Sequence, residues 1–288
     1  MSKVGCVILN YKKYNETINC VESLLKQAEV DMEIVIVDNG SENESAEILR
    51  ERFGQYSNCH ILESGENLGF AKGNNLGISY LRKQGVEYIW VTNSDTIFTD
   101  ELITRDALEA YKEGVGLINV TSYLMSGKEN YFIKYKKKYL VLRMIKEFMI
   151  AYIDAYVHKS KNKKISSGGE RTLSEEKVKE MNETVKRGYL IHTEEYFVTG
   201  SVFLLTKDYF KNYGGLFPET FFYCEETATI MFLHKAGLKT EMVNTGIVLH
   251  KHRASTRKNV NNYGLESRRK IVKLFFMNQK KIRNKYFS

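Results

Sequence analysis

The sequence predicts an α/β protein with a mostly parallel central sheet flanked by helices, and three observations support this. Short apolar runs at residues 4–9, 33–37 and 87–92 have the length and composition of strands buried on both faces. Segments with helical apolar spacing lie between them, at 15–28, 45–53 and 70–82. Strands that alternate with helices at this pace favour right-handed βαβ crossovers, and therefore parallel pairing.

The elements of the first half follow in order. After the first strand, Asn15 is a suitable cap for a helix whose apolar residues recur every three or four positions. The second strand ends at Asp38-Asn39-Gly40-Ser41, a helix covers 45–53, and a short strand lies near 60–62. The helix at 70–82 carries glycine at every fourth position, at Gly69, Gly73 and Gly77. This spacing favours close packing of that helix on the sheet.

Composition excludes several classes of protein. With 288 residues, 43% of them hydrophobic and 27% charged, the chain can bury a substantial core. One proline and 20 glycines exclude collagen-like and low-complexity classes. We find no export signal and no apolar window long enough to span a membrane, which predicts a cytoplasmic protein. Its four cysteines are then expected to be free thiols: Cys6, Cys20, Cys59 and Cys224.

Basic residues exceed acidic residues by 8 and concentrate in two segments. The first is 131–138, followed by an apolar stretch at 139–157 that suits an amphipathic helix and a polar stretch at 158–184 that suits a loop and a surface helix. The second is the C-terminal tail. For the insertion at 128–190, which contains the first of these segments, two interpretations stay open: a helical cap over the acceptor side of a cleft, or a helix resting on anionic lipid. Nucleic acid is disfavoured as a partner, because no nucleic-acid-binding motif is present.

Polar residues end three of the predicted strands. They are Asn10-Tyr11, Asp38 to Ser41, and Asn93-Ser94-Asp95. In parallel α/β sheets, ligands bind beyond the carboxyl ends of the strands, so these residues predict a site at one rim. Asp95 could hold Mg²⁺ or Mn²⁺ together with substrate phosphates, and Asp38 could accept a hydrogen bond from a nucleobase. Lys72, or the start of its helix, is available to phosphate.

These strand ends belong to a longer series of motifs. The first half adds Asn-Leu-Gly-Phe-Ala at 67–71 and Gly-Asn-Asn at 73–75, and the second half adds Phe-Val-Thr-Gly-Ser at 197–201, Gly-Gly-Leu-Phe at 214–217, Glu225-Glu226, Lys-Ala-Gly at 235–237 and His250. The series resembles the family 2 glycosyltransferases of the GT-A fold, most of all their bacterial rhamnosyltransferase-like branch. The resemblance covers roughly residues 3–125 and 195–256.

The resemblance implies an inverting, metal-dependent glycosyltransferase with a nucleoside-diphosphate sugar as donor, dTDP-rhamnose or a UDP-hexose. It implies a hydroxyl of a growing, lipid-linked cell-surface glycan as acceptor. The implied nucleotide site comprises Asn10, Tyr11, Asp38, Asn67, Lys72, Asn74, Asn93 and Ser94. The implied ligands of Mg²⁺ or Mn²⁺ are Asp95 and His250.

The same resemblance implies a carboxylate as catalytic base. Glu226 is the first choice and Glu225 the second, because the loop at 222–224 is one residue shorter than is usual in the family and leaves their register open. A carboxylate at this position would remove the proton of the acceptor while the sugar is attacked from the face opposite the leaving group.

The predicted organisation has four segments. They are a nucleotide-sugar-binding half at 1–127, a helical or mobile insertion at 128–190, an acceptor and catalytic half at 191–256, and a basic amphipathic tail at 257–288. Tail and insertion could touch the inner face of the cell membrane or pair subunits in a homo-oligomer. The alternative function is a non-catalytic nucleotide-sugar-binding or membrane-surface scaffold. A Rossmann-type oxidoreductase is disfavoured, because the turn after the first strand has no glycine triplet.

Overall fold

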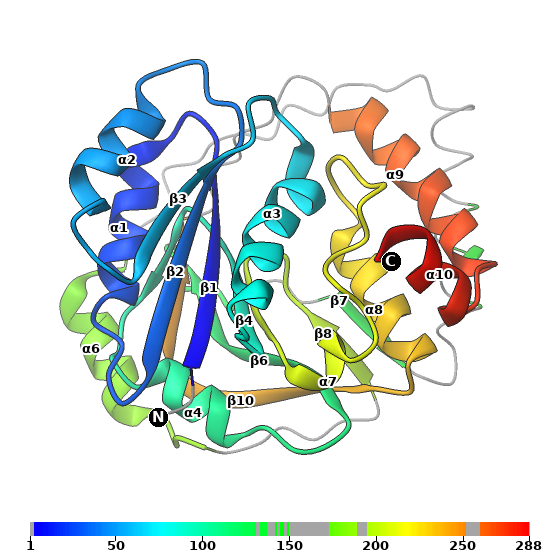
Figure 1. Ribbon diagram of the computed structural model, residues 1–288. Helices are drawn as coiled ribbons and strands as arrows, with labels where there is room; N and C mark the ends of the chain where they lie inside the picture. Colours follow the sequence, from blue (N-terminus) through cyan, green and yellow to red (C-terminus); the bar gives the residue numbers. More distant parts are fainter. Residues whose placement is uncertain are drawn as a thin grey trace.

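The computed structural model describes residues 3–130, 133–136, 173–188, 195–251 and 260–287, and four residues between 142 and 149. Its centre is an eight-stranded sheet in the order β3-β2-β1-β4-β9-β6-β10-β5. Strands β1 (Lys3–Asn10), β2 (Asp31–Asp38), β3 (Cys59–Glu63) and β4 (Tyr88–Asn93) pair in parallel. The α/β class and the parallel pairing of the first half are therefore confirmed (Figure 1).

The second half of the chain completes the sheet. Strand β9 (Val202–Leu205) runs antiparallel between β4 and β6 (Val115–Leu124). Strand β10 (Lys239–His250) is parallel to β6, and β5 (Thr96–Phe98) pairs antiparallel with β10. The antiparallel strands β7 (Ile133–Lys136) and β8 (Glu195–Val198) form a separate small sheet. Strand β7 lies within 128–190, where we predicted only helix and loop; the division into four segments stays a prediction.

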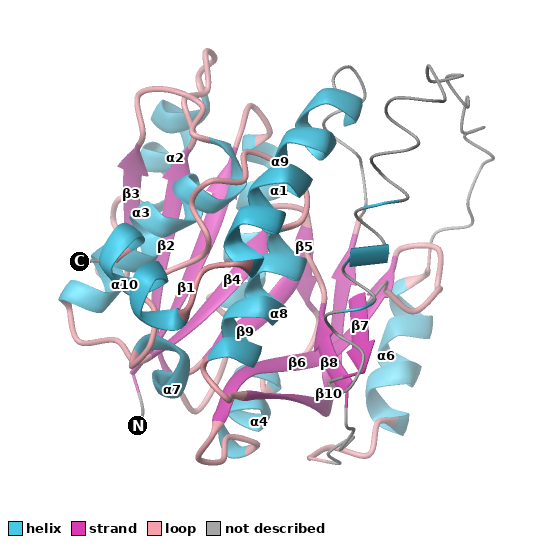
Figure 2. Ribbon diagram, turned by 90° about the vertical axis from the view of Figure 1, so that its right-hand side faces the viewer, coloured by secondary structure: helices cyan, strands magenta, loops and turns pink. Residues whose placement is uncertain are grey.

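Helices cover both faces of the central sheet (Figures 1 and 2). Helices α1 (Tyr14–Leu24), α2 (Ser45–Phe53) and α4 (Ile103–Glu109) enclose one apolar core with one face of the sheet. Helices α3 (Gly69–Lys83), α7 (Lys207–Phe210), α8 (Glu225–Lys235) and α9 (Val260–Phe275) enclose the other core. Strand β1 serves both, because Cys6 and Ile8 face the first core and Val7 faces the second. Cys6, Cys20, Cys59 and Cys224 are free thiols, as predicted.

Helix α3 packs closely on the sheet, as its glycine spacing predicts. A Cβ atom at Gly73 would lie 2.5 Å from Leu9 Cδ1, and one at Gly77 would lie 2.6 Å from Val7 Cγ1. Any larger side chain at these two positions would push the helix away from β1. The glycines therefore set the distance between α3 and the sheet.

Helix α1 differs from the prediction at both ends. It begins at Tyr14 after Lys13, which makes no side-chain cap, so Asn15 lies inside the first turn and the predicted cap is wrong. It ends at Leu24, because the N–H of Ala28 donates instead to the carbonyl of Glu101, 2.8 Å away, and Glu29 adopts a left-handed conformation (φ 60°). Contacts with a distant segment thus override the local apolar spacing.

The segment at 128–190 also contributes helix α6 (Glu175–Thr184), which confirms the surface helix predicted there. The Ser174 side chain caps it by accepting from the N–H of Lys177 at 3.3 Å, and Val178 packs on Ile247 and Leu249 of β10. Of the helix predicted at 139–157, only Leu142, Ile145, Lys146 and Met149 are described; all four are helical and exposed. The rest of that helix and the loop predicted after it lie outside the described residues.

The C-terminal tail is helical, as predicted, and it packs against the domain. Ile271, Leu274 of α9 and Ile282 of α10 (Gln279–Tyr286) are buried in the core that α8 shares. The Ser267 hydroxyl donates to the carbonyl of Phe222 at 2.8 Å, which ties α9 to the loop before α8. In the described part of the chain, no helix is both long and apolar enough to cross a membrane.

Glu219 holds α10 to the same loop, and replacing it by glutamine tests that contact. Lys285 Nζ lies 2.6 Å from its carboxylate, and the Tyr286 hydroxyl donates to it at 2.5 Å. Burial opposes ionisation of Glu219, but these hydrogen bonds outweigh it and hold its pKa below the usual value. The resulting stability is present above the pKa of the unfolded chain and is lost as the pH falls through the lower folded pKa.

Glu219→Gln is therefore expected to lower the free energy of unfolding by about 0.5–1 kcal/mol at pH 7, a modest value because Lys285 is largely exposed. Urea denaturation at pH 7 and pH 3 measures this, and the difference between variant and wild type should be smaller at pH 3 than at pH 7. A difference of equal size at both values would show that charge does not carry the contact.

Candidate active site

Polar residues from three neighbouring strands meet at one rim of the sheet. Asn10, the last residue of β1, stands opposite Asp38, the last residue of β2. On the other side, Leu9 stands opposite Asn93, the last residue of β4. The predicted strand-end residues therefore lie side by side at the carboxyl edge of the sheet.

Asp38 is held rigidly at this rim. Its Oδ2 accepts a hydrogen bond from Asn10 Nδ2 at 2.7 Å, and its Oδ1 accepts from the backbone N–H of Ser41 at 2.8 Å. Asn10 is oriented in turn by the hydroxyl of Thr17, which donates to its Oδ1 at 2.7 Å. Asn10 and Asp38 are both buried. Each Asp38 oxygen keeps a second lone pair, so a pre-organised acceptor faces the rim.

Asn39 shapes the loop before α3, although we predicted no role for it. Its Nδ2 donates to Asn67 Oδ1 at 3.0 Å, and its Oδ1 accepts from the N–H of Leu68 at 3.1 Å. Asn67 Oδ1 also accepts from the N–H of Gly69, which is left-handed (φ +77°). Asn67 thus supports the turn that starts α3. The only hint of this role in the sequence is that Asn39 directly follows Asp38 at the end of a predicted strand.

The other predicted nucleotide-site residues differ in their exposure. Tyr11 and Lys72 are exposed, Lys72 in the first turn of α3. Asn74 is fully buried and donates through Nδ2 to the carbonyl of Phe70 at 2.9 Å. Lys72 is therefore accessible to a ligand, whereas Asn74 supports the helix from inside.

Asp95 and His250 face each other, although they are 155 positions apart in the chain. Asp95 lies in the turn between β4 and β5, and His250 ends β10 opposite Thr96 of β5. The distance from Asp95 Oδ1 to His250 Nε2 is 3.2 Å. A carboxylate oxygen and an imidazole nitrogen together suit Mn²⁺, and less specifically Mg²⁺. Within the described ranges, no group of three or more His, Cys, Asp or Glu lies close enough together to hold an ion.

Glu225 and Glu226 open helix α8 after an unusual turn. Tyr223 and Cys224 both have left-handed backbones, with φ of 72° and 71°. For residues other than glycine this conformation costs roughly 1–3 kcal/mol each, and it persists only where the surroundings hold it. Here the carbonyl of Phe221 accepts from the N–H of Phe70 at 2.9 Å, while Ser267 holds Phe222 from the other side. The turn is thus clamped between α3 and α9.

The two glutamates share a poorly solvated environment. Each residue keeps some accessible surface, but the Glu225 Oε1 atom is buried without a hydrogen-bond partner. Desolvation, followed by the charge of Glu226, raises the pKa of Glu225 to about 8. Desolvation also raises the pKa of Glu226. At neutral pH the pair therefore retains at least one proton, and a carboxylate in this position is a stronger base than an exposed glutamate.

The bend at 199–201, between β8 and β9, connects the glutamate pair to the Asp95 turn. A Cβ atom at Gly200 would overlap Oε1 of Glu226, so the carboxyl group of Glu226 lies directly against this glycine. The carbonyl of the next residue, Ser201, accepts from the N–H of Asn93 at 2.8 Å. Gly200 and Ser201 stood in a motif that we quoted, but their roles depend on contacts that the motif does not display.

Comparisons with known proteins agree with this architecture. Residues 6–214 match the family described as Glycosyl transferase family 2. A stretch of 100 residues is 35% identical to Glycosyltransferase GlyG of Streptococcus pneumoniae and covers 35% of this chain and 32% of that protein. A stretch of 112 residues is 30% identical to the Low-salt glycan biosynthesis hexosyltransferase Agl10 of Haloferax volcanii and covers 38% and 32% of the two chains. The match thus spans about a third of each of these relatives.

Two solved structures share the fold. The mannosyltransferase PcManGT from Pyrobaculum calidifontis, in complex with GDP-Man and Mn²⁺, aligns with a TM-score of 0.55 at 11% identity over 88% of this chain and 57% of that one. Residues 1–349 of S. aureus TarS align with a TM-score of 0.50 at 12% identity over 84% of this chain and 60% of that one. At such identities the likeness shows the fold alone, which is the GT-A fold.

Proposed function

Because the chain belongs to glycosyl transferase family 2, we propose that it transfers a sugar from a nucleoside-diphosphate donor to a hydroxyl of a growing glycan, with inversion. One observation carries this proposal: the bend at 199–201 touches both the Glu226 carboxyl group and the backbone of Asn93. This bend therefore links Glu226 to the strand end that precedes Asp95. An inverting transferase needs a base on one side of the sugar and charge neutralisation on the other.

The nucleotide is proposed to lie along the ends of β1, β2 and β4. Asp38 offers a fixed acceptor to the N–H of the base, with Asn10 holding it in place. Tyr11 is exposed beside it and can cover the base, and Asn93 and Ser94 border the diphosphate. Lys72 and the α3 N-terminus, shaped by Asn67, supply positive charge. Asn74 supports this helix without contacting the ligand.

Mg²⁺ or Mn²⁺ is proposed to bind between Asp95 and His250, whose facing oxygen and nitrogen atoms fit such an ion. When bound, the ion would neutralise negative charge on the departing diphosphate. Contacts within the chain fix the position of Asp95. The N–H of Lys251, directly after β10, donates to the Asp95 carbonyl at 2.9 Å and so ties the β4–β5 turn to the end of β10. PcManGT, of the same fold, is described in complex with Mn²⁺.

Glu226 is proposed as the base, with Glu225 as the second candidate. Its carboxylate accepts the proton of the acceptor hydroxyl, whose oxygen forms a bond to the anomeric carbon as the bond to the diphosphate breaks. Attack comes from the face opposite the leaving group, so the anomeric configuration inverts. The neighbouring glutamate stays protonated and keeps the pair from carrying two charges.

The donor proposed from the motifs is dTDP-rhamnose or a UDP-hexose, and the GDP-Man bound to PcManGT adds a third nucleotide to test. The proposed acceptor is a lipid-linked cell-surface glycan, which would place the enzyme at the inner face of the cell membrane. A role in glycan synthesis is supported by the likeness to the Haloferax volcanii relative, a low-salt glycan biosynthesis hexosyltransferase.

Thermal unfolding with UDP, dTDP, GDP and CMP, each with and without Mn²⁺, tests the donor site. A nucleotide at 100 times its dissociation constant should stabilise the protein by about 2.7 kcal/mol and raise Tm by roughly 5 °C. Asp95→Ala is expected to abolish the part of this shift that requires Mn²⁺. Asp31→Ala, which removes an exposed aspartate at the opposite end of β2, is the matched control.

The proposed site would be supported by a Tm shift that requires Mn²⁺, occurs with one nucleotide, and is lost in Asp95→Ala but kept in Asp31→Ala. That nucleotide would also identify the nucleotide part of the donor. Absence of a shift with every nucleotide would contradict the transferase proposal. A shift without any turnover of the corresponding nucleotide sugar would instead favour the scaffold alternative.

A further inference from the structure

The excess positive charge of the protein resides in its last 22 residues. Residues 267–288 contain eight Lys and Arg and no Asp or Glu, whereas the preceding 266 residues contain 35 of each sign. The net charge of residues 1–266 is therefore zero, and the whole excess of +8 comes from residues 267–288. Helices α9 and α10, which make up this end, lie together at one side of the molecule (Figure 1).

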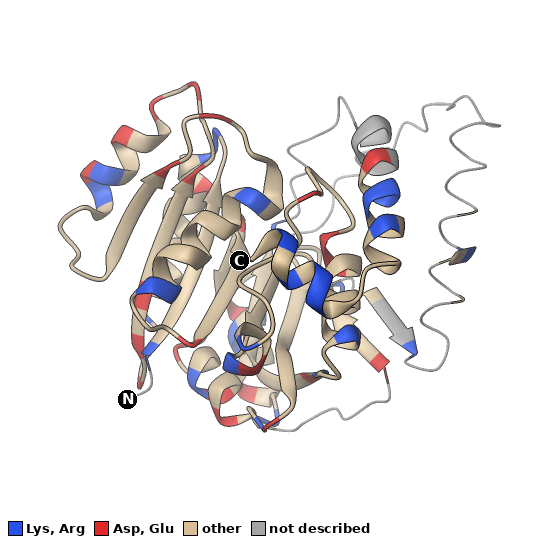
Figure 3. Cartoon of the chain, turned by 45° about the vertical axis from the view of Figure 1, so that its right-hand side comes forward, with Lys and Arg blue, Asp and Glu red and all other residues tan. Residues whose placement is uncertain are grey.

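The structure separates the two kinds of side chain in these helices. The apolar residues Ile271, Leu274 and Ile282 turn inward and are buried. The basic residues Lys273, Lys280 and Lys281 are exposed. Figure 3 marks the Lys and Arg positions along both helices in blue. Lys270 and Lys285 are compensated by Glu219. For Lys273, Lys280 and Lys281, no acidic partner occurs among the residues that the structure describes.

A large exposed aromatic residue, Phe276, lies between these lysines in the sequence. Phe276 follows α9 at the corner that leads into α10, and it is 78% exposed, the highest value among the exposed large hydrophobic residues. Its neighbour Phe275 is partly buried against the core. We call Lys273, Phe276, Lys280 and Lys281 the basic corner. An exposed Phe flanked by unpaired lysines matches the apolar and cationic parts of a membrane interface.

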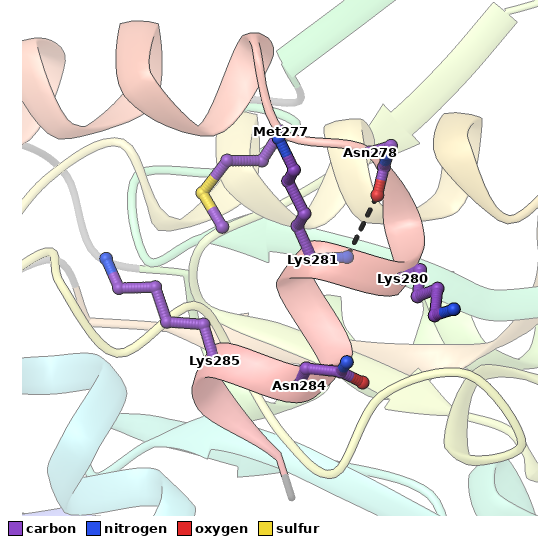
Figure 4. A pocket seen from close by; sticks show the side chains of 6 residues that line it. All are labelled: Met277, Asn278, Lys280, Lys281, Asn284 and Lys285. Carbon is purple, nitrogen blue, oxygen red and sulfur yellow. Dashed lines mark hydrogen bonds between the residues drawn. The ribbon is translucent and has the colours of Figure 1, made fainter.

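A hollow of about 600 Å³ opens beside the corner and is lined by Met277, Asn278, Lys280, Lys281, Asn284 and Lys285 (Figure 4). Three of its six lining residues carry an ammonium group. The surface that these residues expose to the hollow is nevertheless almost entirely apolar, so the hollow adds apolar surface beside the basic corner.

We propose that the basic corner docks on an anionic lipid surface, with Phe276 inserted among the headgroups. The inward packing of the other apolar residues leaves little to bury, so attraction between charges supplies most of the binding and salt weakens it. Binding of single-stranded nucleic acid would use several exposed aromatic residues as stacking platforms, and the corner offers one. This inference does not rest on the proposed transferase activity.

Co-sedimentation with vesicles of phosphatidylcholine, alone or with 30% phosphatidylglycerol, tests the proposal on the full chain. Binding is expected only to the anionic vesicles and should fall at least tenfold between 0.1 and 0.5 M NaCl. Each lysine near the surface contributes roughly fivefold in affinity, so Lys273→Glu/Lys280→Glu/Lys281→Glu should weaken binding by more than about 100-fold. Phe276→Ala should weaken it several-fold. All four side chains are exposed, so Tm should change little in either variant.

The matched control is Lys26→Glu/Lys83→Glu/Lys179→Glu, which changes the net charge equally at exposed lysines elsewhere. Equal losses in both triple variants would overturn the proposal, because net charge alone would then explain binding. Equal binding to neutral vesicles would overturn it as well. One combined result would also overturn it: the protein binds a single-stranded DNA 20-mer as tightly as it binds the anionic vesicles, and Phe276→Ala does not weaken vesicle binding. No donor is used in these experiments, so their failure leaves the transferase proposal standing.

Discussion

Glu226→Gln is expected to lower kcat for sugar transfer by about 10²–10⁴-fold, because an amide cannot accept the proton of the acceptor hydroxyl. Glutamine keeps the size of the side chain, so nucleotide binding in the thermal assay should stay unchanged. The rate should also fall on the acid side of a pH profile at a higher pH than for an ordinary glutamate, since desolvation raises the pKa of both carboxyl groups.

Three further variants locate the base. Glu219→Gln makes the same chemical change in the same loop but faces α10, so it should retain kcat. Gly200→Ala should fold and bind nucleotide while kcat falls, because the added Cβ displaces the flexible end of Glu226 rather than backbone. Loss of turnover in Glu225→Gln together with retention in Glu226→Gln would assign the base to Glu225. Full turnover in both variants would refute a role for the pair.

Glu225→Gln is expected to stabilise the protein by about 2–3 kcal/mol at pH 7. The folded pKa of Glu225, about 8, lies above the ordinary value of 4.5, so the wild type binds a proton more readily when folded. A carboxyl group with a raised folded pKa favours the folded state below the unfolded pKa, and this advantage disappears as the pH rises through the folded pKa. Glutamine, which is always neutral, avoids that loss.

Urea denaturation of both proteins at pH 5, 6, 7 and 8 measures this effect. The gap in free energy of unfolding should be small at pH 5 and should widen towards pH 8. A gap that is independent of pH would mean that Glu225 is ionised in the folded protein. Such a cost of holding a functional carboxyl group in a poorly solvated place is expected of an active site.

Local patterns predicted much of the fold. The helix at Ser45–Phe53 begins and ends where its apolar spacing places it, and the strands of the first half begin and end within two residues of the predicted runs. Such patterns depend on neighbours within a few positions, which the sequence displays directly. The antiparallel insertion of β9 and the pairing of β7 with β8 were not predicted, because they join segments that are far apart in the chain.

The site divides in the same way. Strand ends and the rim rule brought Asn10, Asp38 and Asn93 together in advance. Asn39 and Gly200 were missed, since each acts on a partner at least 26 positions away: Asn67 for the first and Glu226 for the second. No periodicity records such contacts.

The sequence by itself determined the α/β class, the polar strand ends, and which carboxylates and cations the protein has available. Only the tertiary structure decided that Asp95 faces His250, that Glu226 lies against Gly200, and that the tail buries its apolar side and exposes its lysines. The physical reason is range. Secondary structure follows from hydrogen bonds and apolar spacing within a few residues. Strand order and helix packing, in contrast, decide which side chains from distant parts of the chain come into contact and how far each is shielded from water.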